Sequence, residues 1–272
     1  MSEKYWLAIV VVGGGFVYGA ACLYLYLTQH RKVFLVPKTG KETPVDWGLA
    51  YEPVTIDNHG KPLQAWWIPG LKDRPVVLFC HGNGVTMHHL SKHVLFLRPL
   101  GIGIFLFDYQ GYGDSEGKAG EANSCADAAL VWQYLVTQRG IKGENILIYG
   151  HSLGGGVATW LAARHRCGGV ILEGTFTSIP DLATDYYPWL PVRKLARIDF
   201  NNLANMKNIQ APLFITHSTE DEIIPFHHSE HLFANAPFPK QLWPIRGRHA
   251  DAFVQTSTEG LGALRDFFKI GP

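Results

Sequence analysis

Short apolar runs recur along the chain in a pattern that predicts β-strands alternating with helices. Six runs have the length of a strand, and most are separated by segments with helical spacing, for example 123–138 and 157–165. The six runs occupy residues 75–80, 102–107, 145–150, 169–174, 212–216 and 240–245. Strands that are apolar throughout are buried on both faces, so the pattern indicates a mostly parallel sheet covered by helices on either side.

Two further β-like stretches precede these runs, at 51–56 and 63–68. The residues Asp57-Asn58-His59-Gly60 between them are a turn signal, so we expect an antiparallel entry to the sheet. Neither an internal repeat nor a low-complexity linker interrupts the remaining sequence. We therefore predict a single α/β domain over residues 31–272.

The N-terminal region has another pattern, because Tyr5–Leu27 is an apolar stretch of 23 residues without a charge. As a helix it would rise about 35 Å, enough to cross a hydrocarbon layer of roughly 30 Å. We predict an uncleaved membrane anchor over residues 1–30. The alternative is a cleaved signal peptide, with Gly19-Ala20-Ala21 as the small-residue site and Cys22 as a residue open to lipidation.

The charges that flank this segment predict its orientation. Lys4 stands alone before it, whereas four cations follow it: Arg31, Lys32, Lys38 and Lys41. Because cations accumulate on the cytoplasmic side, we expect the main domain there, with a periplasmic or lumenal location as the alternative. Gly15 and Gly19 have the GxxxG spacing that can pair two membrane helices into a homodimer, although small residues can also simply populate a glycine-rich span.

Composition narrows the classes of function. Apolar residues make up 47% of the chain and charged residues 17%, which excludes a disordered protein. The 24 Lys and Arg balance 23 Asp and Glu, so net charge gives no reason to expect nucleic acid as a partner. The four cysteines show no CxxC pairing, and nothing in the sequence requires a metal or a cofactor.

One serine lies in a glycine cluster between two of the predicted elements. Gly150-His151-Ser152-Leu153-Gly154 follows the apolar run 145–150 and precedes the helical segment 157–165, which is the strand–turn–helix setting of a nucleophile elbow. Glycines suit such a turn because it crowds the side chains on either side of the serine. The alternative role for Ser152 is the N-cap of the following helix. We predict a nucleophile.

A serine hydroxyl attacks well only when a base accepts its proton, and histidine is the commonest base. Among 13 histidines, His249 follows the last apolar run, where a loop can return to the carboxyl edge of the sheet. Six of the other twelve fall into two clusters that we interpret as solvated helix faces, although each contains an i,i+4 pair that could hold a metal. These clusters are His88, His89 and His93, and His227, His228 and His231.

The imidazole in turn needs a carboxylate that fixes its tautomer and stabilises its cation. Asp221 fits because it lies in the loop beyond the apolar run 212–216. Glu173 and Asp251 are rival acids, and Glu173 better suits a structural hydrogen bond. The chain order Ser152, Asp221, His249 is the order of the α/β-hydrolase triad.

Acyl transfer also requires donors that already point at the developing oxyanion. The loop 81–84, His-Gly-Asn-Gly, follows the apolar run 75–80 and can bring a backbone N–H close to a substrate. We predict the N–H groups of Asn83 and Leu153 as the two donors, and His81 as a residue that holds the loop. Since these parts follow different strands of a parallel sheet, they should meet at its carboxyl edge.

Taken together, the motifs resemble those of α/β-hydrolases of the serine-hydrolase type. They are HGNG (81–84), FDYQGYGDSEG (107–117), GHSLGGG (150–156), LEGTFTS (172–178), THSTEDEIIP (216–225) and GRHAD (247–251). Within that family, the chain is similar to the membrane-anchored, short-lidded abhydrolase-domain proteins, which are related in motif to lysophospholipase and serine-aminopeptidase-like members. The resemblance spans roughly residues 35–270.

The resemblance implies an α/β-hydrolase fold, with a mostly parallel central sheet, helices on both faces and a short lid over residues 175–210. The lid segment DYYPWLP (185–191) carries aromatic rings and prolines that suit either contact with a bilayer or ordinary lid packing. Ser218 stands where a glycine is common in the family, and we expect only a loop adjustment there.

The resemblance also implies Ser152, Asp221 and His249 as the catalytic triad, with Asn83 and Leu153 as oxyanion donors. The function it implies is a serine hydrolase that cleaves carboxylic esters or thioesters of acylated, lipid-like substrates through an acyl-enzyme. Two alternatives stay open: a membrane-tethered binding or scaffold protein on a hydrolase fold, and a serine peptidase.

Overall fold

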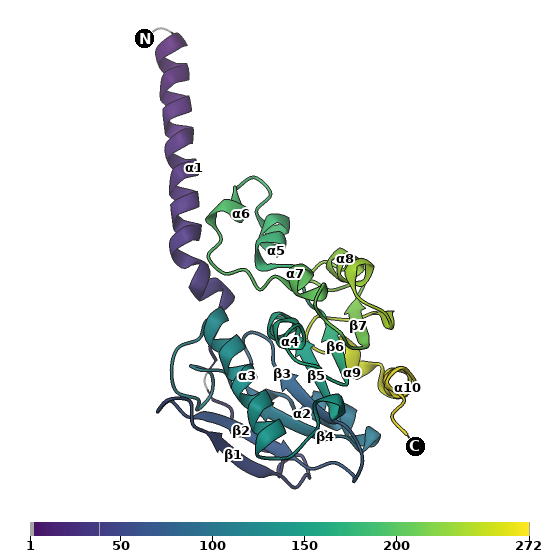
Figure 1. Ribbon diagram of the computed structural model, residues 1–272. Coiled ribbons are helices and arrows are strands. Elements are labelled where there is room, and N and C mark those ends of the chain that lie inside the picture. The colour runs from purple at the N-terminus through teal and green to yellow at the C-terminus, as the bar shows by residue number, and fades with distance from the viewer. Residues whose placement is uncertain (1–2, 38, 272) are drawn as a thin grey trace.

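A long helix projects from a layered α/β domain in the computed structural model, which describes residues 3–37 and 39–271 (Figure 1). The helix α1 (Glu3–Val33) contains a stretch, Val10–Val33, with the length and hydropathy of a membrane span, and its apolar window is not buried in the protein. By length and composition, α1 fits a membrane anchor or a signal sequence. Of the flanking cations, Lys38 lies outside the described residues.

The glycines of the GxxxG spacing lie on the free surface of α1. A Cβ atom added at Gly15 or at Gly19 would meet nothing within 4 Å. Pairing of two such helices through these residues stays a prediction.

Eight strands form one sheet in the order β1-β2-β4-β3-β5-β6-β7-β8. The first two strands enter antiparallel and β2 pairs antiparallel with β4, whereas all pairs from β4 to β8 are parallel. This arrangement confirms the predicted α/β-hydrolase fold. The strands are β1 (Glu52–Ile56), β2 (Leu63–Ile68), β3 (Val76–Cys80), β4 (Gly103–Phe107), β5 (Ile146–His151), β6 (Gly169–Glu173), β7 (Leu213–Ser218) and β8 (Lys240–Ile245).

Helices cover both faces of this sheet, as continuous apolar strands require. Along β5, Ile146 and Ile148 pack into the core on one face, and Leu147 and Tyr149 pack into the core on the other. The helices α3, α4 and α8 cover the first face, and α2, α9 and α10 cover the second. Their bounds are α2 (Ser91–Leu97), α3 (Glu121–Thr137), α4 (Gly154–Ala162), α8 (His227–Asn235), α9 (Ala252–Gln255) and α10 (Ser257–Phe268).

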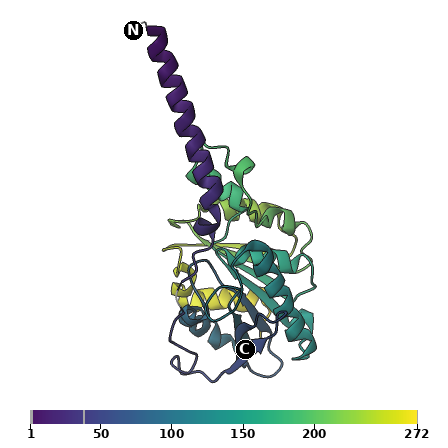
Figure 2. The same cartoon turned by 90° about the vertical axis from the view of Figure 1, so that its left-hand side faces the viewer.

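The lid segment 175–210 contains three short helices, α5 (Ile179–Tyr186), α6 (Val192–Leu195) and α7 (Asn202–Met206). The helix α5 begins where the hydroxyl of Ser178 accepts a hydrogen bond from the N–H of Asp181 at 3.1 Å, with Pro180 in the first turn. In both views, this segment lies beside the lower end of α1 (Figures 1 and 2). The lid and the junction of α1 therefore sit on the same side of the domain.

Candidate active site

Ser152 sits at the tip of a sharp turn between β5 and α4. Its φ of +54° is in the left-handed region, which costs a residue with a side chain about 1–2 kcal/mol. The turn is fixed on both sides: the N–H of Ser152 donates to the carbonyl of Glu173 at 2.9 Å, and the hydroxyl of Thr175 donates to the carbonyl of Ser152 at 2.8 Å. The strain persists because β6 and the loop after it hold the backbone in place.

The glycines beside Ser152 are required by space. A Cβ at Gly154 would lie 2.0 Å from the carbonyl oxygen of Cys80, and a Cβ at Gly150 would lie 2.7 Å from the Cβ of Ala158. The first contact is with the backbone of β3, which cannot move away without breaking the sheet. The close approach of β3, β5 and α4 therefore dictates the glycine pattern on which the sequence prediction depended.

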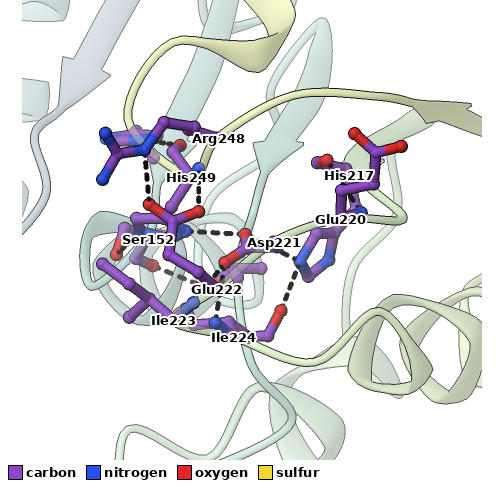
Figure 3. A network of polar contacts seen from close by, with 12 residues as sticks. Ser152, His217, Glu220, Asp221, Glu222, Ile223, Ile224, Arg248 and His249 are labelled. Carbon is purple, nitrogen blue, oxygen red and sulfur yellow. Dashed lines mark hydrogen bonds and ion pairs between the residues drawn. The ribbon is translucent and has the colours of Figure 1, made fainter.

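The loops after β5, β7 and β8 bring Ser152, Asp221 and His249 together (Figure 3). The hydroxyl oxygen of Ser152 lies 2.9 Å from Nε2 of His249, and Nδ1 of His249 lies 2.7 Å from Oδ2 of Asp221. Because a carboxylate only accepts, the proton of the imidazole belongs on Nδ1, which leaves the lone pair of Nε2 facing the serine. This is the arrangement in which a histidine can remove the proton of a serine hydroxyl.

Four hydrogen bonds hold the Asp221 carboxylate. Besides His249, the side chain of His217 donates to Oδ2 at 3.1 Å, and the N–H groups of Ile223 and Ile224 each donate to Oδ1 at 2.8 Å (Figure 3). Burial alone would raise the pKa of Asp221, but the hydrogen bonds from His217 and His249 outweigh it and lower that pKa far below its usual value. Asp221 is therefore ionised at neutral pH.

Two further residues support this arrangement, and neither was predicted from the sequence. Nε2 of His217 lies near both Asp221 and the carbonyl of Ile224, while Nδ1 lies 2.5 Å from the hydroxyl of Ser229, so surrounding groups fix its tautomer. Glu222 accepts the backbone N–H of His249 at 3.0 Å and so links the acid loop to the base loop. Both residues belong to the quoted motif at 216–225, which was the available signal.

The predicted oxyanion loop lies against the elbow. A Cβ added at Gly82 would come within 3.2 Å of the Cβ of Ser152, which places the neighbouring Asn83 beside the nucleophile. The side-chain oxygen of Asn83 accepts from the N–H of Leu35 at 2.7 Å and from the hydroxyl of Tyr112 at 3.1 Å. Within the described residues, the N–H groups of Asn83 and Leu153 have no hydrogen-bond partner, so both remain available to an oxyanion.

His81, the first residue of the oxyanion loop, helps to fix the conformation of that loop. Its Nδ1 lies 2.8 Å from the carbonyl oxygen of Gly82, and its Nε2 lies 3.5 Å from Oδ1 of Asp108. Burial lowers the pKa of His81 to about 4 and raises the pKa of Asp108 to about 7. A neutral imidazole that donates to a backbone carbonyl suits a residue that fixes the loop.

The two rival acids have other partners. Glu173 is buried and accepts from the hydroxyl of Tyr149 and from Nε2 of His93, at 2.5 and 3.1 Å. Asp251 follows His249 closely in the chain, yet its carboxylate pairs with Lys92 at 3.1 Å. In the part of the chain that the structure describes, neither carboxylate bonds to the imidazole of His249, whose partners are Asp221 and Ser152.

Ser218, at the position where the family often has a glycine, has a structural role. Its hydroxyl donates to the carbonyl of Gly247 at 2.5 Å and accepts the N–H of Glu220 at 3.0 Å. It therefore fastens the loop that carries Asp221 to the loop that carries His249.

The interpretation of the histidine clusters as solvated helix faces is wrong for two members. His93 and His228 are buried, at 5% and 1% exposure, and each meets a carboxylate from a distant segment. His93 lies with Glu173 and His151, whereas His228 and His227 lie 2.9 and 3.3 Å from Asp185 on α5. Helical spacing revealed which residues share a face, but not which faces the fold covers.

Comparison with known proteins places the chain in a family. A family model described as serine aminopeptidase, S33, matches residues 72–200. The human α/β-hydrolase domain-containing protein 17B is 38% identical over 194 residues, which cover 70% of this chain and 65% of that protein. The chain belongs to the α/β-hydrolase superfamily. An uncharacterised protein of Mycobacterium tuberculosis is 29% identical over 275 residues, covering 98% of this chain and 97% of that protein.

Solved structures of this superfamily share the fold. The Pyrococcus furiosus esterase Pf2001 aligns with a TM-score of 0.71 at 21% identity, covering 86% of this chain and 98% of that chain. Est1E of Butyrivibrio proteoclasticus, solved with ferulic acid bound, aligns with a TM-score of 0.66 at 18% identity, covering 79% of this chain and 99% of that chain. At these identities the likeness shows the fold alone.

Proposed function

We propose that this α/β-hydrolase is a serine hydrolase that cleaves carboxylic esters or thioesters of acylated, lipid-like substrates. One observation carries the proposal: Ser152, His249 and Asp221 form an unbroken hydrogen-bonded chain whose proton positions suit attack by the serine. A hydroxyl nucleophile next to two free backbone donors serves acyl transfer. Nothing in this chemistry calls for a cofactor or a metal.

In the proposed reaction, the Ser152 oxygen attacks the acyl carbonyl carbon while Nε2 of His249 accepts the hydroxyl proton. The carbonyl oxygen becomes an oxyanion, and the N–H groups of Asn83 and Leu153 donate to it. His249 then gives its proton to the departing alcohol or thiol, which leaves an acyl-serine. A water molecule repeats the attack with His249 as base, and the products are a carboxylic acid and the regenerated serine.

The ester or thioester class is supported by several features that point the same way. Of the similar solved structures, one is described as an esterase and another, Est1E, has ferulic acid bound. The apolar helix α1 is suited to holding the domain at a bilayer, where acylated substrates reside. The cations Arg31 and Lys32 at its end favour a cytoplasmic location of the domain.

A serine peptidase is a second candidate, because the matching family model is described as a serine aminopeptidase. The same triad can attack an amide, so geometry alone does not separate the two reactions. A substrate panel does: matched acyl esters, thioesters and aminoacyl amides should show hydrolysis of the first two classes. Preferential cleavage of the amides would refute the proposal.

The nucleophile is tested with a fluorophosphonate probe on the purified full chain. We expect a covalent adduct on Ser152 that is absent from the folded Ser152→Ala variant, together with a loss of esterase activity of at least about a thousandfold. A folded wild-type protein without adduct and without hydrolysis would instead support a binding or scaffold protein.

A further inference from the structure

A largely apolar cavity of about 300 Å³ lies between the end of α1 and the lid. Its lining includes Leu25 and Val33 of α1, Leu182 and Ala183 of α5, and Leu195 of α6. The size is at the lower end of the range for small-molecule sites, and such sites are lined mainly by apolar side chains. A helix with the composition of a membrane span thus forms one wall of a cavity in the hydrolase domain.

The two walls are joined by specific hydrogen bonds. The side-chain nitrogen of Gln29 donates to the carbonyl of Leu195 at 3.1 Å, and its oxygen accepts the N–H of Arg197 at 2.6 Å. Just beyond the helix, Phe34 is buried and packs its ring against Phe200, with centroids 6.2 Å apart. These contacts give α1 a defined position against the lid.

Both walls are also connected to the loops around the triad. On the α1 side, the N–H of Leu35 donates to the side chain of Asn83, whose backbone is a proposed oxyanion donor. On the lid side, the hydroxyl of Tyr186 donates at 2.6 Å to the carbonyl of Ile223, whose own N–H donates to Asp221. Hydrogen bonds therefore connect both walls to the oxyanion loop and the acid loop, while Ser152 itself is not part of the lining of the cavity.

The position of the cavity along α1 matches the surface of a bilayer. Tyr24 and Tyr26 are exposed on either side of Leu25, which lines the cavity, and the cations Arg31 and Lys32 follow them, which is the order of an aromatic belt and a cationic flank. On the lid, the ring of Trp189 is 60% exposed. A chain leaving the hydrocarbon layer along α1 would reach the cavity first.

We propose that this cavity binds the acyl chain of a substrate that is still inserted in the bilayer, so that α1 is a wall of the acyl-binding site as well as an anchor. The inference rests on the proposed serine hydrolase function and specifies its substrate: a long-chain acyl group presented from the membrane. An acetyl ester dissolved in water would reach Ser152 without using the cavity.

The test uses tryptophan substitutions that fill the cavity from each wall. Hydrolysis of nitrophenyl esters with acyl chains of two to sixteen carbons is measured with the full chain in lipid nanodiscs. Ala183→Trp fills it from the lid, with Ala204→Trp as the control on an exposed position of α7. Leu25→Trp fills it from α1, with Leu27→Trp as the control on an exposed face of the same helix.

We expect the ratio of kcat/KM for the sixteen-carbon ester to that for the two-carbon ester to fall at least tenfold in Ala183→Trp and Leu25→Trp. The ratio should stay within twofold of the wild type in both control variants. Equal ratios in all four variants would overturn the assignment of the cavity. A drop only in Ala183→Trp would overturn the role of α1.

A second measurement does not depend on catalysis. The Ser152→Ala protein in nanodiscs is photolabelled with a diazirine-bearing palmitic acid, and the labelled peptides are identified by mass spectrometry. We expect label on α5, with at least a threefold decrease on adding Ala183→Trp but not on adding Ala204→Trp. Label confined to Val10–Tyr24, as ordinary lipid contact would give, overturns the inference even if the wild type is an esterase. If no ester is hydrolysed and Ser152 does not react with the fluorophosphonate, the proposed function is refuted. The photolabelling still tests whether the cavity binds an acyl chain, because it does not require catalysis.

Discussion

The hydroxyl of Ser152 lies 2.9 Å from Nε2 of His249, although 97 positions of sequence separate the two residues. They meet because the loops after β5 and β8 leave the same carboxyl edge of a parallel sheet. The second nitrogen of the same imidazole is bonded to Asp221, so one hydrogen bond sets the proton position that the other needs. Much of the proposed chemistry depends on this pair of contacts.

Asp221 contacts His249 in the structure, whereas Asp251 is close to it only in sequence. Substitution of these two acids should therefore have very different effects on kcat. Asp221→Asn keeps the shape but favours the wrong imidazole tautomer, so we expect kcat to fall roughly 10³–10⁴-fold. Asp251→Asn removes an exposed pairing with Lys92 and should leave kcat within about twofold. Steady-state kinetics on a short ester compare them, and a large loss in Asp251→Asn would refute the choice of acid.

His217 is expected to act as a positioning residue through Asp221. Removing its hydrogen bond in His217→Ala leaves a buried carboxylate with one fewer donor, and hydrogen bonds to charged groups contribute about 1.5–3 kcal/mol. We therefore expect kcat to fall about tenfold or more with KM nearly unchanged, because substrate does not touch His217. A change in KM alone, with kcat intact, would contradict this role.

The fold could be predicted because two features of the sequence mark the strands: their apolar composition and the residues at their ends. Runs such as 145–150 and 169–174 are mostly apolar and have glycine or polar residues at their ends, and the structure has β5 and β6 within one residue of these limits. The antiparallel entry at β1 and β2 was signalled by the turn at 57–60. Local pattern sufficed because each of these features is local.

The site was predictable only as far as strand ends could be matched to loops. That rule selects Ser152, Asp221 and His249, because the carboxyl ends of parallel strands converge. It does not say that His93 would be buried against Glu173, a residue 80 positions away. Such contacts depend on which helix face meets the sheet, and the spacing of a short helix leaves that undetermined.

The elbow makes a steric prediction that is independent of catalysis. Gly154→Ala would place a Cβ 2.0 Å from the carbonyl oxygen of Cys80, so we expect a loss of about 3 kcal/mol or more in the free energy of unfolding. Gly120→Ala is the matched control, because a Cβ there meets nothing within 4 Å and its backbone is extended. Denaturant titration of both variants gives the comparison, and similar stabilities would show that β3 and α4 can separate at low cost.

The last prediction concerns pH and the buried carboxyl of Asp108. Burial raises its pKa to about 7, the charge of Asp114 adds to this, and the N–H of Met87, which donates to Oδ1 at 2.8 Å, opposes it. His81, which faces it, has its pKa lowered to about 4 and stays neutral above pH 5. Between pH 4 and 7 the folded chain thus keeps a proton that the unfolded chain has released.

Folding that retains a proton is favoured at low pH, so this contribution to stability is complete below pH 4 and is lost as the pH rises to about 7. Asp108→Asn cannot titrate, yet its amide oxygen can still accept the N–H of Met87. We expect the wild type to lose stability relative to Asp108→Asn between pH 5 and pH 8, by of the order of 2 kcal/mol. Denaturant titrations of the detergent-solubilised full chains at both pH values measure the difference. Parallel curves would mean that Asp108 is ionised in the folded protein, and His81 would then face a charge at the base of the oxyanion loop.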